Sequence, residues 1–451
     1  MPQDVANSSN LHIRSRINEG GISLRQILIV GVCCLLNVAD GFDVVAISMA
    51  APHIADSWGI SATTLGVVLS AELVGMMVGS IGLSALSDRY GRRKILIGSV
   101  SAIAIAIAML LTTLASSVTH LIVLRVITGL GIGGVLASAA AVASEFTADK
   151  YKHTAVIIVT SGFACGALAV GPIAAYLLEH FTWQSLFLTG GLLGVILAVL
   201  VVTLIPESME FLASHSSDKR KRLEKINRTL NLLKRFPLNE LSDPPTRQST
   251  SVGFFSLLSA EFLLISMRFW LIFFLGNWVI YLMLKWTPKL FVNMGYELST
   301  GIYALTLFTI GGLFGNIFVG FLSSTRLKLI HVIAALTLTG CLLILIYATW
   351  KPTGITELYS LLFLISFCAT GPLTGMYAVT LSSYPTQLRA SGLGWSLGIG
   401  RTGAIASPVA AGYLVDAGWN MFDLFLILGV PAALISSLLI VSANRIEHTR
   451  Q

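Results

Sequence analysis

Long apolar stretches alternate with short polar ones along the whole chain. A helix needs about 20 mainly apolar residues to cross the hydrocarbon core of a bilayer. We place such stretches at residues 24–48, 63–86, 95–115, 119–146, 154–178, 184–205, 269–291, 300–323, 329–349, 356–382, 390–415 and 421–442. The pattern predicts an all-α membrane protein with about twelve transmembrane helices.

The composition supports this fold class, and the charged residues add an orientation. The 451 residues are 55% hydrophobic and 11% charged, whereas a soluble domain has about 25% charged residues. Most of the 29 Lys and Arg residues lie in the two termini and in alternate loops, and Lys351 is the clearest exception. Because cytoplasmic loops are enriched in Lys and Arg, both termini and the long central loop are expected in the cytoplasm.

The net charge of +7 follows from this topology and does not indicate a nucleic-acid partner. Its densest cluster, Lys219–Arg222, fits either a solvated loop near anionic lipid headgroups or a regulatory surface. All five cysteines fall within predicted spans and are expected to pack as small apolar residues. The N-terminus is not typical of a cleavable signal peptide, because a long polar segment precedes a run that is long enough to span.

Matches between the two parts of the chain indicate an internal duplication. An offset of 236 residues superposes Leu86-Ser87 on Leu322-Ser323, and Pro172–Ala175 on Pro408–Ala411. Two bundles of six helices are therefore expected, with the substrate site between them near the membrane midplane. The predicted division is an N-terminal tail at 1–23, a first bundle at 24–205, a central loop at 206–268, a second bundle at 269–442 and a C-terminal tail at 443–451.

Charged residues inside the predicted spans are few, and each costs roughly 2.5–3.5 kcal/mol in hydrocarbon on insertion scales. Such residues usually face a polar interior and mark a transport pathway. Lys285, near a helix end, is interpreted as a snorkelling side chain. Six others are singled out as candidates: Asp40, Asp43, Glu72, Arg125, Glu145 and Arg401.

Arg401 is the strongest candidate for binding an anion. It lies well within a predicted span among glycines that leave space beside it, and a guanidinium binds a carboxylate bidentately. The alternative is a structural ion pair with Asp40 or Asp43. These two aspartates share a helix face and are the proton-coupling candidates, together with Glu72. An anion bound to the arginine would favour proton uptake by a nearby carboxylate, although one aspartate could instead cap a helix or hydrogen-bond locally.

Aromatic side chains with a polar edge are concentrated in the stretch 269–291. Such side chains suit a flat aromatic ring, although most aromatics in a span face lipid or a packing interface. The candidate substrate-binding residues are Arg401, Asn277, Tyr281, Arg125 and Tyr377.

Small residues in two spans predict close helix packing. Gly129-x-Gly131-x-x-Gly134 matches a dinucleotide-binding fingerprint by letter, but it lies in a transmembrane run without a βαβ context. Helix packing is the better interpretation. Gly162 and Gly166 likewise predict close backbone approach in the fifth span.

A charged motif follows the second predicted span. It reads Ser84-Ala-Leu-Ser-Asp-Arg-Tyr-Gly-Arg-Arg-Lys94 and resembles the loop signature of the major facilitator superfamily, with Ser84 in place of the opening glycine. A weaker copy at 320–328 has Ser324 in place of the aspartate. The carboxylate can pair with guanidinium groups as a cytoplasmic latch, although the cations alone would retain the loop inside. The predicted gate residues are Asp88, Arg89, Gly91, Arg92, Arg93, Glu145 and Arg389.

Two further segments narrow the resemblance to one branch. Asp40-Gly-Phe-Asp43 is similar to the D-G-[FY]-D signature of the aromatic acid:proton symporters, and the run from Tyr384 to Arg401 is similar to a segment of the same branch. The resemblance implies import of benzoate- or hydroxybenzoate-like acids across a bacterial cytoplasmic membrane, with the proton as coupling ion and no cofactor. A monomer in the lipid bilayer, with a small organic acid as its only partner, is expected. The resemblance implies roles for Asp40, Asp43, Asp88, Glu145, Arg389 and Arg401.

The sequence also allows comparison with three alternative functions. The same machinery could carry a non-aromatic acid, such as a muconate-like dicarboxylate or a sugar acid, and Glu72 departs from the family pattern in a way that leaves the pocket shape open. A membrane-embedded enzyme or sensor has little support, because the sequence shows no metal-ligand cluster and no nucleophile–base set. An exporter of cationic drugs is disfavoured, because Arg401 would repel its cargo.

Overall fold

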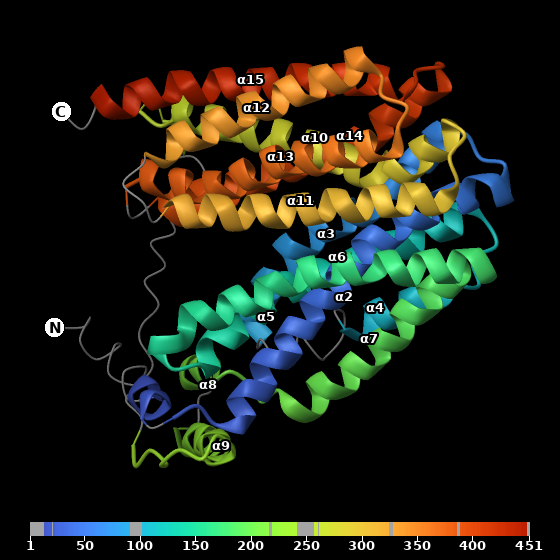
Figure 1. Ribbon diagram of the computed structural model, residues 1–451. Coiled ribbons are helices and arrows are strands. Elements are labelled where there is room, and N and C mark those ends of the chain that lie inside the picture. The colour runs from blue at the N-terminus through green and yellow to red at the C-terminus, as the bar shows by residue number, and fades with distance from the viewer. Residues whose placement is uncertain are drawn as a thin grey trace. The chain divides into compact units, whose positions relative to one another are not determined.

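Helices make up the fold (Figure 1). The computed structural model describes residues 13–19, 21–90, 102–215, 219–240, 257–259, 261–323, 328–385 and 388–448, and these ranges contain no strand. Every predicted span overlaps a helix in the described ranges, which confirms the all-α fold class. The helices are α2 (Leu24–Trp58), α3 (Ala62–Tyr90), α4 (Ala102–Thr112), α5 (Val118–Phe146), α6 (Lys152–His180), α7 (Gln184–Leu204), α10 (Leu263–Asn293), α11 (Leu298–Ser323), α12 (Leu329–Trp350), α13 (Ile355–Ser383), α14 (Arg389–Asp416) and α15 (Met421–His448).

Helix length and apolar composition agree with a membrane protein. Within the described ranges, nine helices are long and apolar enough to cross a bilayer. α4, which is described over Ala102–Thr112, and the helices α14 and α15 also lie at predicted positions, so the described helices are consistent with the twelve predicted spans.

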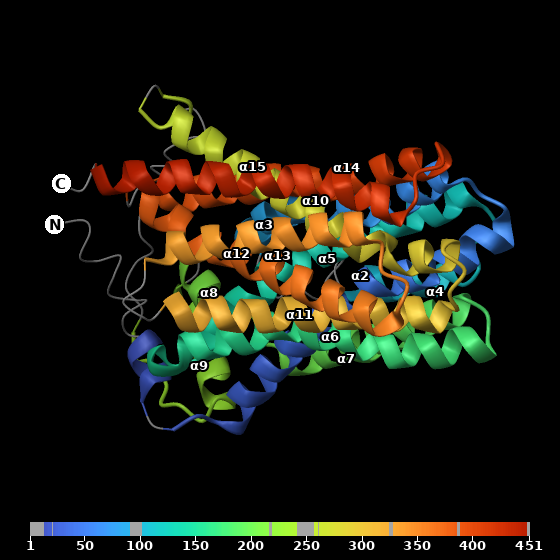
Figure 2. The same ribbon diagram turned by 45° about the horizontal axis from the view of Figure 1, so that its top comes forward.

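Packing divides the chain into two compact units. The first unit comprises residues 1–44, 74–167 and 184–250, and the second comprises 45–73, 168–183 and 251–451. In the first unit α4 packs against α5 and α7. In the second, α11 packs along α13, α10 along α14 and α12 along α15 (Figures 1 and 2). Parts of α2, α3 and α6 thus pack with helices of the predicted second bundle, and the division into two bundles of six stays a prediction of the repeat.

The first long helix extends well beyond the predicted stretch 24–48. It continues through Pro52 to Trp58, because the residues after the stretch are as deeply buried as those within it. Gly59 then ends the helix in the left-handed conformation, with φ of +58°. The N–H of Ile60 donates to the carbonyl of Ala55 at 3.2 Å, which is the bond pattern of a glycine-terminated helix.

The predicted central loop 206–268 contains helices. They are α8 (Met209–His215) and α9 (Lys219–Leu232). α9 buries Ile226 and Leu230 on one face and carries the basic cluster Lys219–Arg222 in its first turn. Burial of that apolar face accounts for a helix in a segment whose net charge suggested a loop.

A residue at the far end of α14 caps the start of α3. Asp416 accepts hydrogen bonds from the backbone N–H groups of Ala62 at 2.9 Å and Thr63 at 2.8 Å, which satisfies donors at the positive end of the helix dipole. Hydrogen bonds from Thr63, and lesser ones from Ala62 and Ser61, hold the pKa of Asp416 below its ordinary value of 3.8. Because the pKa is lowered in the folded state, this stabilisation is complete above that value and is lost as the pH falls through the folded-state pKa.

Close contact between α2 and α6 depends on glycine, as the small-residue pattern predicted. A Cβ on Gly166 would overlap the carbonyl oxygen of Val38, and a Cβ on Gly41 would overlap that of Phe163. Both clashes involve backbone atoms, so no side-chain rotation relieves them. The helix backbones therefore touch directly, as is common for helix pairs in membranes.

We expect Gly166→Ala to destabilise the protein by about 1–3 kcal/mol, the usual cost of overpacking. The matched control is Gly31→Ala in α2, where an added Cβ meets nothing within 4 Å. Thermal unfolding of the purified protein in detergent compares the two variants. Equal melting temperatures for both would contradict the described contact between α2 and α6.

Candidate functional site

A small polar cavity in the second unit contains four of the predicted substrate-binding residues. Its volume is about 140 Å³. α10 contributes Asn277 and Tyr281, four residues apart on one helix face. The full lining is Leu73, Asn277, Tyr281, Tyr377, Leu397, Arg401 and Ala404.

Arg401 supplies the only charge in this lining. Among the residues that the structure describes, its guanidinium forms no ion pair and no hydrogen bond. An arginine is permanently protonated and carries five donors. The cavity therefore presents an unneutralised cation with free donors, which is the chemistry that binds a carboxylate.

Close packing of α10 against α14 places the polar side chains around this cation. A Cβ on Gly400, next to Arg401, would come within 2.8 Å of the Cβ of Phe273 and 3.0 Å of the side-chain nitrogen of Asn277. The Asn277 amide donates to the carbonyl of Phe273 at 2.8 Å. The Phe273 ring lies edge-on to Tyr377, with centroids 5.5 Å apart. Tyr377 is thus held beside the cavity by an aromatic contact.

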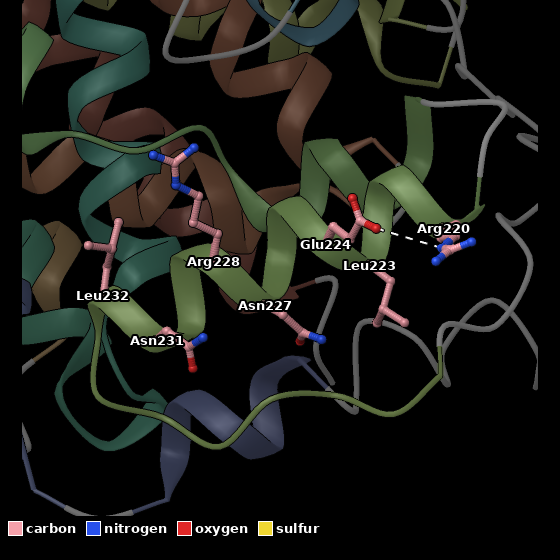
Figure 3. A pocket seen from close by; sticks show the side chains of 7 residues that line it. All are labelled: Arg220, Leu223, Glu224, Asn227, Arg228, Asn231 and Leu232. Carbon is pink, nitrogen blue, oxygen red and sulfur yellow. Dashed lines mark ion pairs between the residues drawn. The ribbon is translucent and has the colours of Figure 1, made fainter.

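A larger hollow, of about 650 Å³, lies on the surface of α9 and is no comparable site. All its lining residues come from this one helix, and their side chains project from it in several directions (Figure 3). Arg220 and Glu224 form an exposed ion pair across one turn of this helix at 3.7 Å. Such pairs contribute little, so a solvated helix face is the simplest interpretation of the basic cluster.

Asp43 pairs with Arg125 in the first unit. The Nη1 of Arg125 donates to Oδ1 of Asp43 at 2.8 Å, and both side chains are fully buried. The Nη2 of Arg125 donates to Oγ1 of Thr112 at 3.2 Å, and its guanidinium lies 4.7 Å from the ring centre of Phe187. Arg125 is a predicted substrate-binding residue, and Arg401 is the alternative partner that the sequence suggests for the aspartates. The structure instead gives Asp43 a guanidinium within its own unit.

The two carboxylate oxygens of Asp43 differ in their hydrogen bonding. Oδ2 is buried and accepts no hydrogen bond from any residue in the described ranges. Asp40, one turn earlier on α2, is 3% exposed. The two aspartates thus lie on the same buried helix face, as predicted.

Glu72 pairs with Lys285 in the second unit, which corrects the interpretation of Lys285 as a snorkelling side chain. The Nζ of Lys285 lies 3.7 Å from Oε2 of Glu72, and both side chains are fully buried. A snorkelling lysine would reach water. Lys285 instead turns inward because α3 supplies a carboxylate at the same depth.

The predicted gate residues are described only in part. Gly91, Arg92 and Arg93 lie outside the described residues, and the backbone of α3 is described through Asp88 and Arg89 but their side chains are not. Two others are described in full. Glu145 is 5% exposed in the last turn of α5, and Arg389, the first residue of α14, donates from Nε to the carbonyl of Tyr384 at 3.1 Å.

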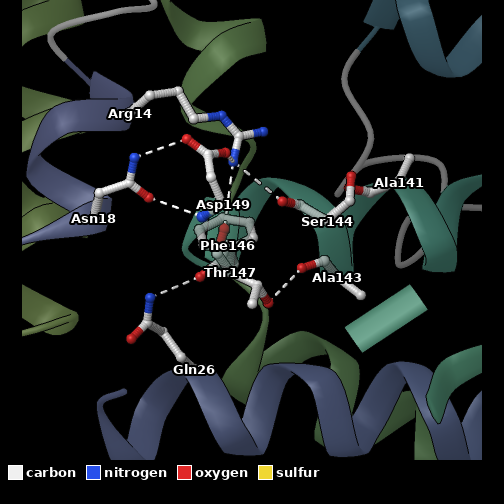
Figure 4. A network of polar contacts seen from close by, with 9 residues as sticks. All are labelled: Arg14, Asn18, Gln26, Ala141, Ala143, Ser144, Phe146, Thr147 and Asp149. Carbon is white, nitrogen blue, oxygen red and sulfur yellow. Dashed lines mark hydrogen bonds and ion pairs between the residues drawn. The ribbon is translucent and has the colours of Figure 1, made fainter. Parts of the chain in front are cut away.

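A polar network at the end of α5 was not predicted from the sequence (Figure 4). Arg14 donates to the carbonyls of Ser144 at 3.2 Å and Thr147 at 3.3 Å, and Gln26 donates to that of Phe146 at 2.8 Å. A helix C-terminus leaves such carbonyls without intrahelical partners and favours a nearby cation. The N-terminal segment thus caps α5. The sequence signal for this contact is the apolar pair Ile13 and Ile17, four residues apart beside Arg14, and the structure buries both.

These features place the chain in the class of polytopic membrane transporters. Residues 33–356 match the Major Facilitator Superfamily. A solved structure titled as a D-xylose-proton symporter shares the fold with a TM-score of 0.70 at 15% identity, covering 92% of this chain and 97% of that one.

Similarity to individual transporters indicates which branch of this superfamily the chain resembles. The chain is 32% identical to the 4-hydroxybenzoate transporter PcaK of Pseudomonas putida over 430 residues, which cover 94% of each protein. It is 31% identical to the gallate transporter of Pseudomonas putida, covering 94% of this chain and 93% of the relative. The chain belongs to the Major Facilitator Superfamily, within the branch that contains these aromatic acid transporters. It is a multi-pass membrane transporter for a small molecule and not an enzyme.

Proposed function

We propose that the protein imports a benzoate- or hydroxybenzoate-like acid across the cytoplasmic membrane together with protons. The observation that carries this proposal is Arg401, a cation without an ion pair in the described part of the chain, inside a cavity that also presents Tyr281 and Tyr377. The guanidinium binds the carboxylate of the substrate, and the tyrosines contact the ring and hydrogen-bond its polar substituents. The names of the relatives, 4-hydroxybenzoate and gallate transporters, support this substrate class.

Proton coupling resides on α2 in this proposal. Oδ2 of Asp43 accepts no hydrogen bond from a described residue and is a position where a proton can bind. A proton there removes the counter-charge of Arg125 and weakens the 2.8 Å pair that ties α2 to α5. Asp40 lies one turn away and gives the proton a second buried carboxylate. Proton binding therefore changes how α2 packs in its unit.

Two further features complete the proposed mechanism. The distribution of Lys and Arg places both termini in the cytoplasm, so the end of α5 held by Arg14 is the cytoplasmic end. There Asp88, Arg89, Gly91, Arg92, Arg93, Glu145 and Arg389 form the proposed gate. The carrier acts as a monomer of two bundles, and alternating access moves the bundles around the bound acid.

The test is uptake of labelled benzoate, 4-hydroxybenzoate and gallate by a transporter-null strain that expresses the chain. We expect saturable uptake of at least one of these acids, inhibited by the others and absent from cells with an empty vector. Sugar acids and muconate are expected to compete weakly. Saturable uptake of a non-aromatic acid, with no aromatic acid transported or competing, would overturn the proposed substrate class.

A further inference from the structure

Asn277 brings a hydrogen-bond acceptor to the lining of the substrate cavity. Its amide nitrogen donates to the carbonyl of Phe273 at 2.8 Å, and because only the nitrogen of an amide can donate, this bond fixes the orientation of the amide group. The nitrogen also lies against α14, where a Cβ on Gly400 would come within 3.0 Å of it. The oxygen, Oδ1, is therefore the end of the amide that remains for the cavity. It accepts no hydrogen bond from any residue in the described ranges.

The cavity is small enough to bring the substituents of a ligand against its walls. Its volume of about 140 Å³ is close to the roughly 150 Å³ of a protein cavity that binds one benzene ring. The ring of an aromatic acid held by Arg401 thus fills the space, and a ring substituent meets the lining. Leu73, Leu397 and Ala404 give part of that lining an apolar surface, beside which a polar substituent would lose its hydrogen bonds.

The polar lining residues differ in the substituents that they recognise. The hydroxyls of Tyr281 and Tyr377 can donate or accept, so they tolerate any polar group. The amide oxygen of Asn277 can only accept, and a group that binds it must supply a hydrogen. A phenolic hydroxyl supplies one, whereas an unsubstituted, methoxy-substituted or fluoro-substituted ring does not.

We propose that Asn277 is a specificity-determining residue that selects ring-hydroxylated benzoates by accepting a hydrogen bond from the phenolic hydroxyl. The inference rests on the proposed function and narrows its substrate class. In the bound acid the carboxylate pairs with Arg401 and the hydroxyl donates to Oδ1 of Asn277. Benzoate leaves that oxygen without a partner in a desolvated site and therefore binds more weakly.

The test compares unlabelled 3-hydroxybenzoate, 4-hydroxybenzoate and benzoate as competitors of the labelled aromatic acid that the wild-type protein takes up. We expect at least one hydroxybenzoate to compete about fivefold more strongly than benzoate, the usual effect of one net hydrogen bond. Its methoxy and fluoro analogues should lack this advantage. Asn277→Leu replaces the amide by an apolar group of similar size and should reduce the advantage of the hydroxyl to less than about twofold.

The matched control is Asn316→Leu in α11. The oxygen of Asn316 already accepts a hydrogen bond from Thr374 at 2.8 Å, and Asn316 is not among the residues that line the cavity. Its replacement should leave the ratio of hydroxybenzoate to benzoate competition unchanged. If Asn277→Leu fails to reach the membrane, Asn277→Ala answers the same question, because it removes the same oxygen without adding bulk, and the advantage should again fall.

The outcomes separate the two claims. Absence of uptake of every benzoate-like acid by the wild-type protein would defeat the proposed function. Uptake in which benzoate competes as strongly as both hydroxybenzoates, or in which Asn277→Leu keeps the advantage of the hydroxyl, would overturn the role of Asn277 alone. An equal advantage for the methoxy or fluoro analogue would overturn it as well, because the recognised group would then not be a hydrogen-bond donor.

Discussion

Arg401→Ala should reduce uptake of an aromatic carboxylate by about a hundredfold, since losing the charged partner of a bound, desolvated carboxylate costs about 3 kcal/mol. Arg401 supplies the only charge in the described cavity lining, so no neighbouring group replaces it. Arg401→Lys keeps the charge but loses the planar fork that holds a carboxylate bidentately, and we expect an intermediate loss. Initial rates of labelled 4-hydroxybenzoate uptake, normalised to the protein in the membrane, measure all three proteins.

The control for this result is Arg220→Ala. Arg220 is an arginine on α9 whose side chain is 90% exposed, and its replacement should leave the uptake rate unchanged. Near-normal uptake by Arg401→Ala, with normal membrane levels, would remove Arg401 from the binding site and with it the main support for an anionic substrate.

Single replacements in the Asp43–Arg125 pair should cost about 3–5 kcal/mol of stability, because each leaves an uncompensated buried charge. We expect Asp43→Asn and Arg125→Met each to lower the melting temperature and to abolish accumulation of the acid. The double variant Asp43→Asn with Arg125→Met removes both charges, so it should regain much of the stability. It should still not accumulate substrate against a gradient, because the proposed proton acceptor is gone.

Thermal unfolding in detergent and uptake into proteoliposomes separate the structural from the coupling role. Glu19→Gln is the control, because Glu19 pairs with Arg16 at 3.0 Å in the same unit but is 41% exposed, and exposed pairs contribute little. Restored proton-driven accumulation in the double variant would show that the pair is structural only.

The sequence predicted the structure well where a residue type is energetically costly in its surroundings, such as a charge inside an apolar helix. The apolar runs predicted every long helix, because hydrocarbon tolerates few alternatives to an apolar helix. Charged residues inside the apolar runs identified Arg401, Asp43 and Glu72 as residues of interest. The aromatic-rich stretch 269–291 supplied Asn277 and Tyr281 as substrate-binding candidates, and both line the cavity.

The ion-pair partners of the buried charges could not be predicted from the sequence, because they depend on which helices pack against one another. Arg125 is 82 positions from Asp43, and Lys285 is far from Glu72 in the chain, so spacing could not select either partner. The end of α2 at Trp58 was missed because burial, and not hydropathy alone, sustains the helix past Pro52. α9 was missed because its charge outweighs the apolar face that it buries.

The central claim is that one protein couples a proton gradient to an aromatic acid through Arg401 and the carboxylates of α2. The direct measurement is accumulation of labelled 4-hydroxybenzoate in proteoliposomes that contain only the purified chain and an imposed pH gradient. With one proton per monocarboxylate, the acid should accumulate on the side of higher pH, by up to about tenfold per pH unit. This accumulation should collapse when a protonophore is added and should be absent in Arg401→Ala. The same internal concentration with and without the pH gradient would contradict the claim.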